Sequence, residues 1–151
     1  CHTPPLFTNQ QIAVIGAPEP DGLPLDVGAQ ITYGAPELKA GFKVPTLRNI
    51  VQTAPYMHSG KFDNLQEVAE FYNGGRGHAV PQGVDLHLHW HISSPNLTEY
   101  ELARLVDFLG TLTDESLTPE VPLQLPSGMA PAGNTIQSHT AKTKTTSGDA
   151  S

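Results

Sequence analysis

The sequence lacks the features of a membrane-spanning or nucleic-acid-binding protein. No apolar run approaches the length that crosses a bilayer, and a formal net charge of −7 disfavours both nucleic acid and anionic membrane surfaces as partners. Only 38% of the 151 residues are hydrophobic, whereas glycine and proline each occur 14 times. These values predict one loop-rich domain whose core needs help from a cofactor or a partner domain.

Aromatic residues are also missing after Phe108, and from about Asp114 the chain is rich in Ser, Thr, Pro and Ala. We expect residues 1–113 to form the folded domain and residues 114–126 to lie extended on it. Residues 127–151 have too little apolar surface to offset the entropy lost on ordering, so we expect a disordered tail.

Two helices are predicted by capping boxes. Asn64–Glu67 and Thr98–Glu101 each place a capping side chain three residues before a glutamate, and apolar residues follow at helical spacing. Gly74 and Gly110 mark the expected ends of these helices. Residues 3–41 predict extended segments and turns, because proline and glycine interrupt them repeatedly.

The single cysteine, Cys1, is followed directly by His2. This pair matches the last two positions of the Cys-x-x-Cys-His motif that attaches haem c, in which the cysteines form thioethers and the histidine ligates iron. Taken alone, a Cys–His dipeptide is more typical of an ordinary free thiol.

The most informative segment runs from residue 42 to residue 60 and contains FKVPTLRNI and APYMHSG. Pro45, Pro55 and Gly60 disfavour a regular helix or strand. The segment nevertheless collects a thioether, an imidazole, a guanidinium and several hydroxyls. Such a composition is typical of a loop that is shaped around a ligand.

This segment, together with the run HTPPLFTN at residues 2–9, resembles the haem-wrapping segment of the di-haem cytochrome c peroxidases and their MauG-like relatives. The resemblance covers about residues 1–113. It implies a mainly α, class I cytochrome c-like domain that is loop-rich and binds haem c. The chain would be the C-terminal haem domain, starting within its Cys-x-x-Cys-His motif, and a second haem would lie in an N-terminal half.

The resemblance also implies the iron ligands. Cys1 would carry a thioether and His2 would be the proximal ligand. The position of the sixth ligand, a methionine in the peroxidases and a tyrosine in MauG-like members, falls on Tyr72. A thioether favours ferrous iron and a high potential, whereas a phenolate favours ferric iron and a low one. Met57 remains an alternative ligand, and Tyr72 has an alternative role in core packing.

Further roles follow from the same resemblance. Arg48, Lys43 and His58 would line the haem, with the Arg48 guanidinium suited to a propionate carboxylate. Thr53 and Pro55 fall where family members give oxygen ligands to a calcium ion between the haems.

The alternating run Leu86–His91 has no counterpart in that family. In a strand or an extended loop it would place His87, His89 and His91 on one face. Three imidazoles at this spacing could bind copper or zinc, and solvated histidines are the alternative. Trp90 is a candidate redox relay.

The resemblance therefore implies a hydrogen peroxide-dependent oxidoreductase in the periplasm or on the cell surface, where haem c is attached. A peroxidase would draw electrons from a small cytochrome or copper protein, whereas a MauG-like enzyme would oxidise a partner protein; Tyr72 favours the latter. The fragment alone should be inactive, because the peroxide-binding residues would lie in the N-terminal half. The alternative function is a non-catalytic module for haem electron transfer or copper binding.

Overall fold

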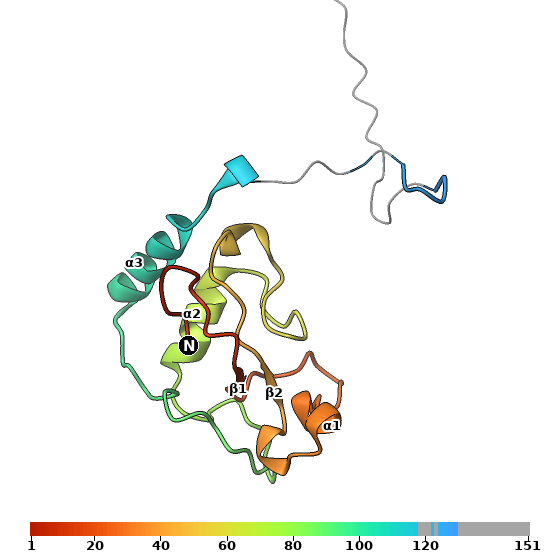
Figure 1. Cartoon of the computed structure of the whole chain (residues 1–151). Helices are drawn as coiled ribbons and strands as arrows, with labels where there is room; N and C mark the ends of the chain where they lie inside the picture. Colours follow the sequence, from red (N-terminus) through yellow and green to blue (C-terminus); the bar gives the residue numbers. More distant parts are fainter. Residues whose placement is uncertain (118–121, 123, 130–151) are drawn as a thin grey trace, which may run out of the picture. The chain divides into compact units, whose positions relative to one another are not determined.

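The computed structural model describes residues 1–117, 122 and 124–129, which fall in two units. The first unit, Cys1–Leu117, holds the described helices and strands (Figure 1). In the second, the Leu125 amide donates to the Met129 carbonyl (2.8 Å) and closes a turn. The tail predicted at 127–151 lies outside the described residues from residue 130 onward.

A two-stranded antiparallel sheet organises the N-terminal half of the first unit. Strand β1 (Ile12–Val14) pairs with β2 (Gly41–Lys43), so that Val14 stands opposite Gly41. Gly28 has φ +56° and bridges to Gly41, where a Cβ atom would lie only 2.4 Å from the Gly41 carbonyl oxygen. Only glycine fits this close approach.

Both helices predicted from capping boxes are present. Helix α2 (Leu65–Asn73) begins at Asn64, whose side chain accepts from the Glu67 amide. Helix α3 (Glu99–Gly110) has the complete reciprocal capping box between Thr98 and Glu101. Local hydrogen bonds at the first turn therefore fix where each helix starts.

In the part of the chain that the structure describes, three shorter elements have 3-10 geometry, namely η1 (Pro36–Leu38), η2 (Ile50–Gln52) and η3 (Glu115–Leu117). The last of these begins the segment that we expected to be extended. Helix α1 (Ala29–Tyr33) falls where we expected only extended segments and turns. It has no side-chain cap, and Gly34 ends it in the left-handed conformation at φ +64°.

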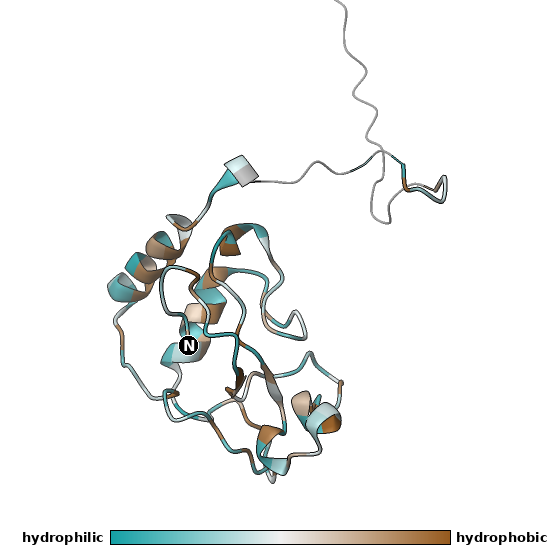
Figure 2. Cartoon of the chain, viewed as in Figure 1, coloured by the Kyte–Doolittle hydropathy of each residue, from teal (hydrophilic) through white to brown (hydrophobic). Residues whose placement is uncertain are grey.

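The core is small and open. Tyr56, Leu65 and Leu109 form its centre, where α2 and α3 pack together and η2 meets α3. In the described part of the chain no large side chain is completely enclosed. Figure 2 shows apolar residues spread along loops as well as helices. The loop-rich character predicted from composition is confirmed, since the described residues form three α-helices and one small sheet.

Among the residues that the structure describes, no helix has the length and apolar character that crossing a bilayer requires.

The capping box of α3 allows a direct test of helix stability. Replacing Thr98→Ala removes the acceptor for the Glu101 amide (3.3 Å) and should lower the free energy of unfolding by about 1 kcal/mol. Chemical denaturation measures this loss. Thr3→Ala is the control, because Thr3 is exposed and makes no side-chain hydrogen bond in the described structure. Equal effects of the two substitutions would contradict the assigned role.

The same cap should make stability depend on pH. The Thr98 amide donates to the Glu101 carboxylate (2.8 Å), and this hydrogen bond lowers the pKa of Glu101 below its ordinary value of 4.5. The stabilisation is therefore present above pH 4.5 and is lost as the pH falls through the lowered pKa.

When the pH is lowered from about 7 to about 3, the Tm of Glu101→Gln should therefore fall by less than the Tm of the parent protein. Glu99→Gln is the matched control, since Glu99 lies in the same first turn without such a hydrogen bond in the described structure. Parallel Tm curves for the parent and Glu101→Gln would rule out this linkage.

Candidate functional site

The imidazole of His2 is held in one orientation. Its Nδ1 atom donates to the Phe7 carbonyl (3.0 Å), in a turn closed by the Phe7 amide donating to the Thr3 carbonyl (2.8 Å). A carbonyl can only accept, so the neutral ring carries its proton on Nδ1. The Nε2 atom is then left as a metal ligand, the arrangement usual for metal-binding histidines. Cys1 beside it is a free, partly buried thiol.

Arg48 holds the same turn from a distant part of the sequence. Its Nε donates to the Pro5 carbonyl (2.9 Å), Nη2 donates to the same oxygen, and the guanidinium lies 5.6 Å from the centroid of the Phe7 ring. The Thr46 hydroxyl donates to the neighbouring Leu6 carbonyl (2.6 Å). The segment from residue 42 to residue 60, singled out in the sequence, therefore positions the loop that follows His2.

His58 and Lys43 differ in their surroundings. His58 Nε2 donates to Glu19 Oε1 (2.8 Å), and its ring stacks on Phe42 with centroids 3.7 Å apart. The His58 and Glu19 side chains are only 13% and 10% exposed. Lys43 ends β2, is exposed, and lines a shallow pocket of about 520 Å³ together with Tyr33.

The possible iron and calcium ligands between residues 53 and 57 lie in one irregular loop. Thr53 donates its hydroxyl to the Ile50 carbonyl (2.9 Å), which also accepts from the buried Tyr56 hydroxyl (3.0 Å). Thr53 and Pro55 are exposed. Met57 is partly buried and has φ +68°. Tyr56 anchors this loop through its buried, hydrogen-bonded side chain, although the sequence alone predicts no role for it.

Tyr72 lies in the last turn of α2. Its ring meets Phe71 edge-on with centroids 5.2 Å apart, and 37% of its surface remains exposed. Burial by the surrounding protein raises the pKa of Tyr72 above its ordinary value of 10.0. The side chain is therefore partly accessible, which is compatible with a group that a flat cofactor would cover.

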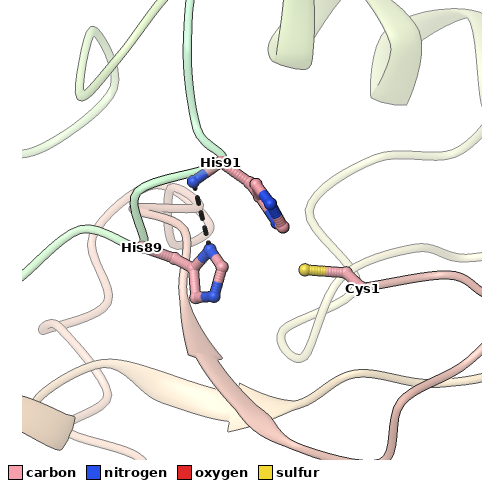
Figure 3. A group of neighbouring side chains, drawn as sticks. All are labelled: Cys1, His89 and His91. Carbon is pink, nitrogen blue, oxygen red and sulfur yellow. Dashed lines mark hydrogen bonds between the residues drawn. The ribbon is translucent and has the colours of Figure 1, made fainter.

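The histidine-rich run forms a loop rather than a strand. Only two of its three imidazoles gather, and Cys1 completes the group: ligand atoms of Cys1, His89 and His91 all lie within 4.8 Å of one another (Figure 3). His87 is outside this group. Sequence alternation could not reveal the contribution of Cys1, since 88 positions separate it from His89.

The structure anchors this loop through its backbone. The His89 amide donates to the Val14 carbonyl at the end of β1 (2.8 Å). The Arg76 guanidinium donates to the carbonyls of His89 (2.8 Å), Ile92 (2.8 Å) and Leu88 (2.6 Å). The imidazoles are therefore presented from a loop that is fixed independently of any ligand.

Trp90 is 76% exposed, and its centroid lies 3.5 Å from that of His91. Slight desolvation of the exposed ring, followed by the charge of the neighbouring His89, lowers the pKa of His91. A lowered pKa favours the neutral imidazole, which is the form that ligates metals.

Together these features define a loop-rich domain with a Cys–His pair, in which the histidine offers one free ring nitrogen. No family model matches the sequence. The cytochrome-c peroxidase IdrP1 of Denitromonas iodatirespirans is 31% identical over 140 residues, covering 75% of this chain and 36% of that protein. IdrP2 of Pseudomonas sp. (strain SCT) is 33% identical over 151 residues, covering 82% and 38%.

The methylamine utilization protein MauG of Paracoccus denitrificans (strain Pd 1222) is 37% identical over 81 residues, covering 44% of this chain and 20% of MauG. A solved MauG-like protein associated with microbial copper homeostasis is 36% identical with a TM-score of 0.58, covering 70% of this chain and 33% of that one. The chain is therefore homologous to the cytochrome-c peroxidases IdrP1 and IdrP2 and to MauG. It spans 36% and 38% of the two IdrP proteins.

The anchoring of the histidine loop can be tested without a ligand. Arg76→Ala removes the hydrogen bonds to three carbonyls and should speed amide exchange in residues 86–92 by about tenfold. Hydrogen exchange followed by mass spectrometry measures the rate. Arg104→Ala is the control, because its pair with Asp107 is exposed at both ends. Unchanged exchange in the Arg76 variant would show that the loop is held by other contacts.

Proposed function

We propose that this chain is the C-terminal, class I cytochrome c-like haem domain of a di-haem, hydrogen peroxide-dependent oxidoreductase. The observation that carries the proposal is the orientation of His2: the Phe7 carbonyl engages Nδ1 and leaves Nε2 free, directly beside the Cys1 thiol. The homology to peroxidases and MauG supports it.

The residues present fit haem c. Cys1 would form one thioether, with its partner cysteine in the preceding part of the protein, and His2 would ligate the iron through Nε2. The small, open core is compatible with a domain that packs part of its apolar surface against a cofactor. The bound haem would supply one-electron redox chemistry.

Tyr72 is our preferred sixth ligand, ahead of Met57. Burial raises the pKa of the Tyr72 phenol, so the free side chain is protonated at neutral pH. To hold ferric iron as a phenolate, Tyr72 would have to give up this proton. This requirement would stabilise the ferric state and favour the MauG-like mechanism, in which a partner protein is oxidised, over a peroxidase that takes electrons from a small donor protein.

The other residues would act through the haem surroundings. Arg48 positions the loop after His2 and has a guanidinium suited to a propionate. His58 is oriented by Glu19, and exposed Lys43 stands at the end of β2. Thr53 and Pro55 would offer oxygen ligands to a calcium ion shared with the N-terminal half.

That N-terminal half would carry the second haem and the peroxide-binding residues, so the present chain alone should not turn over. Because haem c is attached outside the cytoplasmic membrane, we place the protein in the periplasm or on the cell surface.

The assignment of Tyr72 can be tested on the haem-loaded full-length protein. Tyr72→Phe should remove the phenolate-to-iron charge-transfer absorption and raise the reduction potential of one haem, because a ligand that favours ferric iron is lost. Visible spectroscopy and a redox titration measure these changes. Tyr100→Phe is the matched control, since Tyr100 lies on α3 with its ring exposed.

If Met57→Leu changes the spectrum while Tyr72→Phe leaves it intact, Met57 is the ligand instead. For the haem site itself, the decisive result is retention of covalent haem in this domain on a denaturing gel. Absence of attached haem from wild-type protein made with a haem c maturation system would refute the proposed function.

A further inference from the structure

Cys1, His89 and His91 converge without any part in the iron ligation described above. One soft thiolate and two imidazoles are a ligand set that suits thiophilic ions. We propose that these three residues bind Zn²⁺ in the haem-free chain. The proposal does not depend on haem attachment at Cys1.

The spacing of the three ligand atoms fits such an ion after small side-chain movements. Tetrahedral zinc with Zn–S of about 2.3 Å and Zn–N of about 2.0–2.1 Å holds its ligand atoms about 3.5 Å apart. The three atoms lie within 4.8 Å of one another in the absence of an ion. The group therefore needs to close by no more than about 1.3 Å. The exposed His91 side chain can make this movement. Three protein ligands would leave the fourth coordination position of the ion open to water.

Hydrogen bonds already fix the backbone of the loop that carries the two imidazoles. The hydrogen bonds from Arg76 and to Val14 hold the loop in place, so binding requires little ordering of the chain. Figure 3 shows the His89 and His91 rings facing the Cys1 sulfur.

One hydrogen bond must be released when the ion binds. The His91 amide donates to His89 Nδ1 (3.2 Å), so the neutral His89 ring carries its proton on Nε2. Coordination through Nε2 would move this proton to Nδ1 and free the His91 amide. Coordination through Nδ1 would replace the hydrogen bond directly. In both cases the His91 amide loses its partner, and this loss can be observed.

Binding also exchanges a proton at Cys1. The thiol loses H⁺ to solvent and forms an S–Zn bond, with no change in oxidation state. A thioether bond from Cys1 to haem would consume the same sulfur. Zinc binding and haem attachment at Cys1 would therefore exclude each other, and the ion would occupy the thiol only before the cofactor is attached.

The test uses the full 151-residue chain produced without haem, with a short extension before Cys1 so that its α-amine is not free. Titration against a competing chelator should show one tight Zn²⁺ per chain. Cobalt(II) in place of zinc should give a thiolate-to-metal charge-transfer band that Cys1→Ser abolishes. His89→Ala and His91→Ala should each weaken Zn²⁺ binding by about 100-fold or more, since even residues behind metal ligands contribute 10–100-fold.

His87→Ala is the matched control, because His87 is the same residue type in the same loop but outside the group. It should leave the affinity unchanged. Circular dichroism checks that each variant is folded. If His89→Ala unfolds, the result is taken from His91→Ala, because the exposed His91 ring makes no hydrogen bond in the described structure.

Equal weakening by His87→Ala, a cobalt complex without the thiolate band, or no stoichiometric binding would each overturn the proposal. Failure of zinc binding leaves the haem proposal intact. Conversely, a chain that binds zinc but never acquires haem would refute the proposed function alone.

Discussion

Three consecutive carbonyl groups, those of Pro5, Leu6 and Phe7, tie the N-terminal segment to the rest of the domain. Each accepts a hydrogen bond from a side chain: Pro5 from Arg48, Leu6 from Thr46 and Phe7 from His2. Two of these donors come from about 40 residues further along the chain. The same set of bonds fixes the position of the turn and the ring nitrogen that His2 leaves free. Any function of His2 therefore depends on the segment around Arg48.

The domain is held together by such polar bridges because its apolar core is limited. Tyr56, Leu65 and Leu109 form a centre between the helices, while several large apolar side chains remain exposed. Burial of apolar surface is the main favourable contribution to folding, so a domain with an open core gains more than most from a cofactor or a neighbouring domain. This is consistent with a chain that spans little more than a third of the IdrP proteins to which it is homologous.

The parts of the fold that were predictable from the sequence depend on local interactions. The caps at Asn64 and Thr98 act within one helical turn, so four residues of sequence contain the signal. Helix α1 was missed because it is only five residues long and has no side-chain cap.

The candidate sites depend on contacts between distant residues. The partner of His58, Glu19, is 39 positions away, and the grouping of Cys1 with His89 joins residues 88 positions apart in the folded unit Cys1–Leu117. Alternation along residues 86–91 predicts which side chains share a face only if the segment is a strand. Because it forms a loop, the alternation does not predict which imidazoles lie together. Homology could suggest His2 and Tyr72, but only the folded chain shows which nitrogen of His2 is free.

The position of Trp90 determines what the fluorescence of this protein reports. It is the only tryptophan in the sequence, and its indole packs against the His91 imidazole. The tryptophan fluorescence of the chain therefore arises from one loop and not from an average over several sites. A change in the position or charge of His91 alters the surroundings of that single emitter. The protein thus carries an intrinsic optical probe against His91, which reports events at this loop without any added label.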